Sequence, residues 1–237
     1  MGRVGRAGNM AGSGRGRGLG IAALVVGLLG LGLGIGTAVY ANSAYGRGTL
    51  SSGSMSPTYT PGQQIVWEKV DGSEVRRGDV VMFTAPGRVT SGGVERVIGV
   101  GGDRVACCAL VGGEERVTVN GEPIKEPYVS GGDADGVHLS YDVKVPQGRL
   151  FLLGDHRADA MDSRFFRADH GGTVPVDAVR GRVTDDRSAA VVLGTALLLG
   201  AVLVLTGIGL GIGFVVVRRR KAPPVPPVPW PVQPTQG

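Results

Sequence analysis

A short serine-containing segment carries the residue types of a nucleophile held on a fixed loop. The segment runs from Ser52 to Thr58 and reads SGSMSPT. Ser54 stands between a glycine and a methionine, and a proline follows three residues later. A serine hydroxyl is a weak nucleophile and needs a general base within hydrogen-bond reach. A base for Ser54 must therefore come from another part of the chain.

Three further stretches follow this segment in an informative order. They are residues 77–83 (RGDVVMF), 95–103 (ERVIGVGGD) and 154–164 (GDHRADAMDSR). Each stretch alone is a weak signal, but their order, their spacing and an apolar run before Ser52 make the set specific. Together they resemble the type I signal peptidase family, in its actinobacterial form. These are membrane serine proteases that remove signal peptides from exported proteins. The resemblance covers most of residues 42–187.

The resemblance implies a role for several residues. Ser54 matches the nucleophile, and the Ser52 hydroxyl matches the group that joins the Ser54 backbone N–H in an oxyanion hole. Arg96, Asp162 and Arg164 match a charged framework that supports the site. The family's base is a lysine that burial keeps neutral, which forms a Ser-Lys dyad with the nucleophile.

Two positions depart from the family's pattern. The family's lysine immediately precedes the arginine that matches Arg96, and this chain has Glu95 there. The family usually has a serine two residues before the aspartate that matches Asp162, and that serine hydrogen-bonds the lysine. This chain has Ala160 at that position. Both the base and its supporting hydroxyl are thus replaced.

Three interpretations of the site follow. In the first, Glu95 is the base, and burial raises its pKa from about 4.3 toward about 6–7. In the second, His156 in the last stretch is the base. In the third, the site is catalytically impaired, and the domain binds signal peptides or a partner without cleaving them.

Two apolar runs surround the segment that carries these motifs. Residues 19–41 and 189–217 contain no charged side chain over 23 and 29 residues. At about 1.5 Å per residue, a helix of either length crosses a hydrocarbon core of roughly 30 Å. A cleavable signal peptide is the alternative for the first run, but secretory apolar regions are about 7–15 residues long. The length therefore favours an uncleaved transmembrane helix.

Charge is distributed unevenly along the chain. The net charge is +5, but residues 42–187 contain 17 basic and 20 acidic residues, a net charge of −3. The excess of arginine lies before the first apolar run and after the second. The positive-inside rule therefore predicts a multi-pass protein of the cell membrane, with cytoplasmic termini and residues 42–187 outside. The basic isoelectric point belongs to the tails, which argues against a nucleic-acid partner.

The residues between the apolar runs have the pattern of a mainly β domain. Predicted strands cover residues 64–70, 79–84, 94–100, 116–119 and 149–153. Asn120-Gly121 is typical of a type I′ hairpin turn. Residues 106–147 form an elaboration between better-defined core stretches. The predicted fold is a signal-peptidase-like β domain outside the membrane, flanked by two transmembrane α-helices.

The cysteine pair and the two terminal tails say little about the function of the chain. Cys107 and Cys108 are adjacent, which fits either two buried thiols or a strained bridge, and gives no metal-ligand spacing. No cofactor motif is present. Residues 1–18 are predicted to be disordered. Residues 218–237 are basic and then proline-rich, a composition that favours polyproline II and could bind a partner.

The resemblance implies a serine endopeptidase that hydrolyses the bond after a small-x-small motif. Its partners would be signal peptides of exported pre-proteins and membrane lipid. A self-cleaving repressor with a related Ser-Lys fold is disfavoured, because a membrane anchor precedes Ser52 where such a protein needs a DNA-binding module.

Overall fold

The computed structural model describes residues 14–85 and 87–220. The chain forms two compact units, one made of residues 1–39 with 188–237 and one made of residues 40–187. The predictions of a disordered N-terminal tail and a proline-rich C-terminal tail fall mostly on residues 1–13 and 221–237, outside the described residues. Helix begins at Gly14, so the last five residues of the predicted N-terminal tail are helical.

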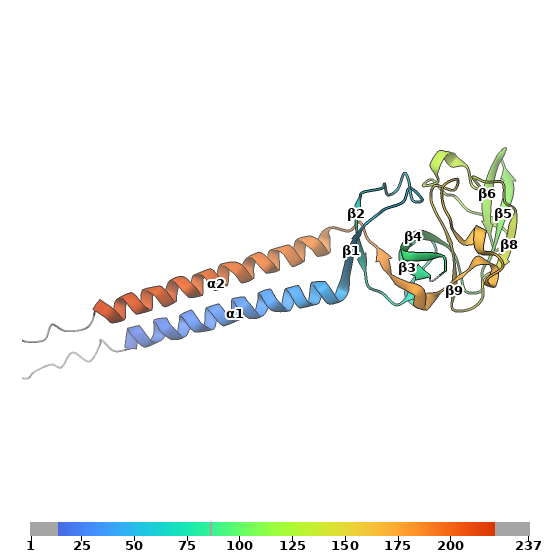
Figure 1. Ribbon diagram of the computed structural model, residues 1–237. Coiled ribbons are helices and arrows are strands. Elements are labelled where there is room, and N and C mark those ends of the chain that lie inside the picture. Colours follow the sequence, from blue (N-terminus) through green and yellow to red (C-terminus); the bar gives the residue numbers. More distant parts are fainter. Residues whose placement is uncertain (1–13, 86, 221–237) are drawn as a thin grey trace, which may run out of the picture. The chain divides into compact units, whose positions relative to one another are not determined.

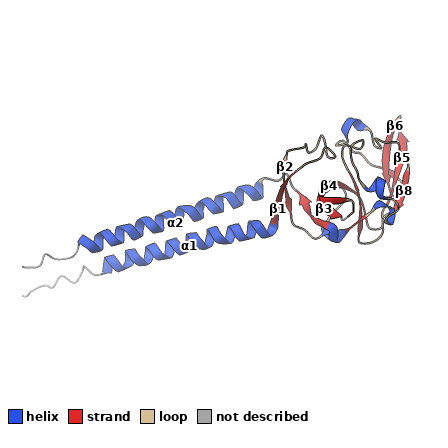
Figure 2. Cartoon of the chain, viewed as in Figure 1, coloured by secondary structure: helices blue, strands red, loops and turns tan. Residues whose placement is uncertain are grey.

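The first unit contains two long helices, α1 (Gly14–Ala44) and α2 (Ser188–Arg220) (Figures 1 and 2). Both are long and apolar enough to cross a membrane by length and composition, with mean hydropathies of 2.3 and 2.5. Their backbones approach closely at glycines, because a Cβ at Gly30 would lie 2.7 Å from the Gly200 carbonyl oxygen. Small residues permit this kind of packing between apolar helices.

The second unit is mainly β, as the sequence predicts, and its larger sheet has seven antiparallel strands. The strand order is β1-β2-β11-β3-β4-β9-β10. The bounds are β1 Tyr45–Thr49, β2 Gln64–Glu68, β3 Val80–Ala85, β4 Val89–Val100, β9 Arg149–Leu153, β10 Val174–Pro175 and β11 Val179–Val183.

The smaller sheet has four antiparallel strands in the order β7-β6-β5-β8. It is built from residues of the predicted elaboration. The bounds are β5 Arg104–Val111, β6 Glu114–Val119, β7 Glu122–Pro123 and β8 Tyr141–Lys144. Asn120 and Gly121 connect β6 to β7 with φ of 56° and 87°, which confirms the predicted hairpin turn. Cys107 and Cys108 on β5 are joined by a disulfide, one of the two alternatives left open by the sequence.

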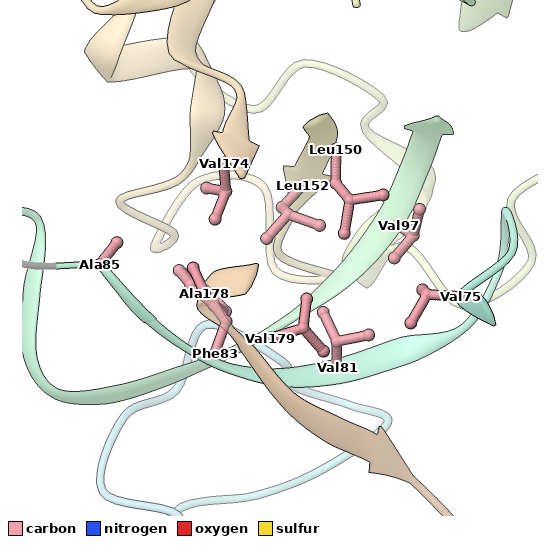
Figure 3. Packing of buried hydrophobic residues seen from close by; sticks show 10 residues of the cluster. All are labelled: Val75, Val81, Phe83, Ala85, Val97, Leu150, Leu152, Val174, Ala178 and Val179. Carbon is pink, nitrogen blue, oxygen red and sulfur yellow. The ribbon is translucent and has the colours of Figure 1, made fainter. Parts of the chain in front are cut away.

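Strand β9 is covered on both faces of the larger sheet. Its sequence RLFLL is a continuous apolar run rather than an alternating one. Leu150 and Leu152 join one buried cluster, whose side chains converge in Figure 3. Phe151 and Leu153 point the other way and join a second cluster with the β5–β8 sheet. A run without alternation is what a strand with two covered faces requires.

A third buried cluster lies under the serine segment. Met55 is fully buried and packs with Leu50 and Tyr59, which flank it in the sequence, and with Ile65 of β2 and Val80 of β3. Burying a large apolar side chain contributes about 1.5–3 kcal/mol. Met55 therefore fixes the loop that displays its neighbour Ser54.

Candidate active site

The serine loop brings two hydroxyl groups together. The Oγ atoms of Ser52 and Ser54 are 3.0 Å apart and share a hydrogen bond. Ser52 is exposed and Ser54 is half-buried. Within the described residues, the Ser54 backbone N–H donates no hydrogen bond to a protein group. This N–H is therefore available to an incoming oxyanion.

The segment that begins at Gly154 holds the serine loop from the other side. The His156 backbone N–H donates to the Ser54 carbonyl oxygen at 2.9 Å, and the Thr58 hydroxyl donates to Asp155 at 2.5 Å. A Cβ at Gly154 would lie 2.6 Å from the Ser54 carbonyl oxygen and would collide with the Ala160 side chain. Close backbone approach thus requires glycine at position 154.

A cavity of about 380 Å³ opens beside the two serines. Glu95 lines it together with Ser52 and Ser54, so the structure brings the predicted nucleophile, oxyanion residue and lysine-position residue to one site. The cavity is also lined by Trp67, Met82, Arg88, Asp159 and Met161.

Glu95 is buried on β4, with only 6% of its surface exposed. Burial raises the pKa of the Glu95 carboxyl well above its usual range, and the nearby Asp162 carboxylate raises this pKa further. Arg164 and Arg88 offset part of this shift. The environment therefore favours the neutral acid, which can donate a hydrogen bond but cannot accept a proton as a base.

The predicted charged framework divides into two separate ion pairs. Arg164 donates twice to Asp162, at 2.8 Å each, and both side chains are fully buried. Asp162 also accepts the Gly154 N–H at 3.2 Å, which ties this pair to the segment under Ser54.

The second pair joins Arg96 to Asp155, with N–O distances of 2.8 and 2.6 Å. The Arg96 guanidinium also lies 3.9 Å from the ring centroid of Tyr128. Glu95 and Arg96 are neighbours on β4, so their side chains point to opposite faces. Arg96 therefore supports the serine loop through Asp155 and Thr58, and it is not one of the residues that line the cavity.

Comparison with known proteins identifies the family. A family model described as "Signal peptidase, peptidase S26" matches residues 21–185. The chain belongs to this family of serine proteases. A signal peptidase I of Bacillus licheniformis is 36% identical over 120 residues, which cover 47% of this chain and 61% of that protein. The chain thus matches about three fifths of this relative's length.

Two further signal peptidases are similar to parts of the chain. The signal peptidase I of Bacillus caldolyticus is 32% identical over 55% of this chain and 72% of that protein. A probable signal peptidase I of Mycobacterium leprae is 37% identical over 38% of this chain and 37% of that protein. A crystal structure of a signal peptidase I from Enterococcus faecalis covers 46% of this chain and 97% of that chain, with a TM-score of 0.37 and 26% identity.

No lysine takes the place of the base in this signal peptidase family member. Residues 42–187 contain three lysines, and none of them lines the cavity. Lys69 donates to the Asn42 carbonyl and Lys144 to the Gly102 carbonyl, while Lys125 lines a different cavity. Among the described residues, the titratable side chains that line the cavity are those of Arg88, Glu95 and Asp159.

His156 does not reach Ser54 with its ring in this structure. The ring lies 3.9 Å from the Asp159 carboxylate, and His156 contacts Ser54 through its backbone N–H instead. It is absent from the residues that line the cavity. The geometry therefore gives this histidine a positioning role for the serine loop.

Arg88 and Asp159 also line the cavity. Arg88 lies outside the sequence motifs, and Asp159 lies within the 154–164 stretch without a predicted role. The Arg88 side chain is 9% exposed and donates to Asp169 and to the Gly172 carbonyl, both at 2.6 Å. Asp159 lies against the serine loop, because a Cβ at Gly53 would be 2.8 Å from its Oδ2. Both positions depend on contacts between distant segments.

Proposed function

We propose that this chain is a membrane-bound signal peptidase I homologue that hydrolyses the bond after a small-x-small motif in secreted precursors. The observation that carries the proposal is the pair of hydroxyls of Ser52 and Ser54, 3.0 Å apart at the edge of a cavity of about 380 Å³. Family membership supports a serine-protease reaction at this place.

The reaction would follow an acyl-enzyme route. The Ser54 Oγ would attack the scissile carbonyl and pass its proton to the ionised Glu95 carboxylate. The Ser54 N–H and the Ser52 hydroxyl would stabilise the oxyanion, once that hydroxyl turns away from the Ser54 Oγ. Removing such a donor typically costs about 3 kcal/mol of transition-state stabilisation. The tetrahedral intermediate would collapse with cleavage of the scissile C–N bond, and Glu95 would return the proton to the leaving amine. Water would then hydrolyse the Ser54 ester, with Glu95 accepting the proton of that water and returning it to the Ser54 Oγ.

The membrane arrangement is part of the same proposal. The apolar runs 19–41 and 189–217 would span the cell membrane, with residues 1–18 and 218–237 in the cytoplasm and residues 42–187 outside. Signal peptides reach such an enzyme in the lipid, so the membrane would be a partner as well as an anchor. The proline-rich tail would be available to a cytoplasmic partner.

A second candidate function is binding of precursors without cleavage. It is favoured by the raised pKa of Glu95, which leaves this position neutral where a base is needed. Ala160 supports the same reading, because its methyl group offers no hydrogen bond to a base. The two candidates share the fold and the cavity and differ in whether Ser54 can lose its proton.

A cleavage assay separates the two. The full chain in detergent micelles is mixed with a pre-protein whose signal ends in Ala-x-Ala, beside a Ser54→Ala variant. Cleavage by the wild type that disappears in the variant supports the peptidase. No cleavage by the wild type, with cleavage by the double variant Glu95→Lys, Ala160→Ser, would instead favour the binding function.

A further inference from the structure

We propose that Arg88 is a positioning residue for Glu95: its guanidinium, fixed at the wall of the cavity, stabilises the carboxylate form of Glu95. The need for a carboxylate rests on the proposed function, in which Glu95 accepts the Ser54 proton. The effect of Arg88 on Glu95 rests on the geometry of the cavity and on the charges around it, and it can be measured without cleavage.

A bend at the start of strand β4 lets Arg88 and Glu95 reach one cavity. Arg88 immediately precedes β4, and Glu95 lies seven positions further along the chain. A straight strand rises about 3.3 Å per residue and would separate their Cα atoms by roughly 23 Å, yet both side chains line the same cavity. Gly92 lies between them with φ of 94°, and the pairing of β3 with β4 shifts register between Phe83 and Ala85. This part of the strand is therefore not straight.

The Arg88 guanidinium is held in place by protein groups. It donates to the Gly172 carbonyl and to the Asp169 carboxylate, both at 2.6 Å, and it lies 4.8 Å from the centroid of the Phe166 ring. Gly172 is itself closely packed, because a Cβ there would collide with the Ser163 carbonyl. A charge that is fixed in this way acts on the cavity without any rearrangement of the protein.

Arg88 favours the carboxylate of Glu95 without an opposing effect from its own partner. Burial is the largest cause of the raised pKa of Glu95, and three charged groups then act on it. Asp162 raises this pKa and its buried partner Arg164 lowers it, so the members of that ion pair oppose each other. Arg88 also lowers the pKa, whereas Asp169, the partner of Arg88, is 59% exposed and is not one of the three groups.

The effect of Arg88 on Glu95 acts through space. In the described part of the chain, Arg88 forms its ion pair with Asp169 and none with Glu95. Two buried groups still interact over such a separation, because little solvent screens them. Asp159 lies at the same cavity, but its side chain is 63% exposed and water screens its charge. The raised pKa of Glu95 should therefore be higher still without Arg88.

Removal of Arg88 should change the pH dependence of the reaction. Without this charge, the pKa of Glu95 should increase by about one unit. Because only the carboxylate accepts the Ser54 proton, kcat/KM should fall about tenfold on the acidic side of the profile. At pH values above the pKa in both proteins, the two profiles should converge. A purely structural loss would instead lower kcat/KM by the same factor at every pH.

Three variants of the full chain in detergent micelles test this inference. Arg88→Met removes the charge, Arg88→Lys keeps a charge that stays constant while Glu95 titrates, and Arg149→Met is the control. Arg149 also holds the segment that anchors Arg88, through the Thr173 hydroxyl and carbonyl, but it does not line this cavity. The pKa of Glu95 is measured by NMR of isotope-labelled glutamate carboxyl groups, and the Glu95 signal is identified by its loss in Glu95→Gln. The pH profile of kcat/KM for an Ala-x-Ala pre-protein is measured in parallel.

We expect the pKa of Glu95 to be about one unit higher in Arg88→Met, to return close to the wild-type value in Arg88→Lys, and to stay unchanged in Arg149→Met. An unchanged pKa in Arg88→Met, or equal shifts in the two Arg88 variants, would overturn the inference.

The two measurements also separate this inference from the proposed function. Cleavage of the pre-protein with parallel pH profiles for wild type and Arg88→Met would sink the role of Arg88 and leave the proposed function standing. A shifted pKa of Glu95 in Arg88→Met, with no Ser54-dependent cleavage by the wild type, would sink the proposed function and leave the effect of Arg88 on Glu95 standing.

Discussion

At the residue scale, the two groups of the proposed mechanism differ in how ready they are for their roles: the proposed nucleophile is held in place, and the proposed base is held neutral. Ser54 is held by a buried methionine on one side and by the His156 N–H on the other, and its own N–H is available to an oxyanion. Glu95 lies at the same cavity, but burial and Asp162 favour its neutral form. In the proposed mechanism, activity depends on whether Glu95 can ionise when substrate is bound.

The pH dependence of stability should report the state of Glu95. A carboxyl with a raised folded-state pKa binds its proton more tightly in the folded protein, so the unfolding free energy falls as pH increases above about 4.3. We expect wild type to lose thermal stability between pH 5 and 8, and Glu95→Gln to lose less. Glu122→Gln, at an exposed carboxyl, should follow the wild type. Parallel pH profiles for wild type and Glu95→Gln would contradict the raised pKa.

The pH dependence of cleavage tests the role of Glu95 as base. Only the ionised carboxylate can accept the Ser54 proton, so kcat/KM should increase with pH through the raised pKa of Glu95. Glu95→Gln should reduce the rate by about 100-fold or more, since general-base catalysis contributes about 10²–10⁴. A rate that stays constant across pH 5–9 would exclude Glu95 as the base.

The sequence predicts the serine pair and Glu95 at one site through the order of the motifs, and the structure places them around one cavity. It does not predict that Arg96 pairs with Asp155, because the two residues are 59 positions apart and either could pair locally. Arg88 has no motif signal, because its side chain reaches the cavity through contacts that no spacing rule encodes. Asp159 lies in the 154–164 stretch, but the motif alone assigns it no role.

At the element scale, strand β4 connects two parts of the site. Its residue Glu95 contributes to the cavity, while Arg96 binds Asp155 beneath the serine loop. Asp155 in turn accepts the Thr58 hydroxyl, so β4, the segment after β9 and the serine loop form one connected unit. A change at Arg96 should therefore affect both stability and catalysis.

Replacing Arg96 by alanine should strongly destabilise the β unit. It would leave the fully buried Asp155 carboxylate without its cation, and breaking a buried pair in this way costs about 3–5 kcal/mol. Arg104→Ala is the matched control, because the Arg104–Asp142 pair is exposed and its loss should cost much less. Urea unfolding of the full chain gives both values. Similar midpoints for the two variants would show that Arg96 has no special structural role.

The strands show what the sequence pattern can and cannot reveal. Five predicted strands correspond to β2, β3, β4, β6 and β9, which are rich in valine, leucine and isoleucine. The missed strands include β1 (YGRGT) and β11 (VRGRV), where glycine and arginine weaken the local signal. β1 pairs with β2 and β11 pairs with β3. These hydrogen-bonded pairings stabilise a strand conformation that the local sequences do not favour on their own.

At the scale of the whole molecule, the chain combines a β unit with a pair of apolar helices. The sequence predicts two apolar helices from length, hydropathy and charge, since uncharged runs of 23 and 29 residues need no tertiary information to be recognised. The sequence does not predict which glycines bring α1 close to α2, because glycines occur on several faces of each helix.

Packing of the two helices should depend on particular glycines. A Cβ at Gly30 would lie 2.7 Å from atoms of α2, whereas one at Gly32 would meet nothing within 4 Å. Gly30→Leu should therefore destabilise the helix pair, by about 1–3 kcal/mol for an overpacked contact. Gly32→Leu should not. Loss of helical circular dichroism on titration with SDS measures the difference. Equal effects at the two positions would argue against this packing.

Analysis of the cleavage products tests whether Ser54 removes signal peptides from precursors. The full chain and its Ser54→Ala variant are incubated in micelles with a pre-protein, and the products are identified by mass spectrometry. We expect one new N-terminus after the small-x-small motif with the wild type and an intact precursor with Ser54→Ala. An intact precursor in both reactions, or the same cut in both, would contradict it.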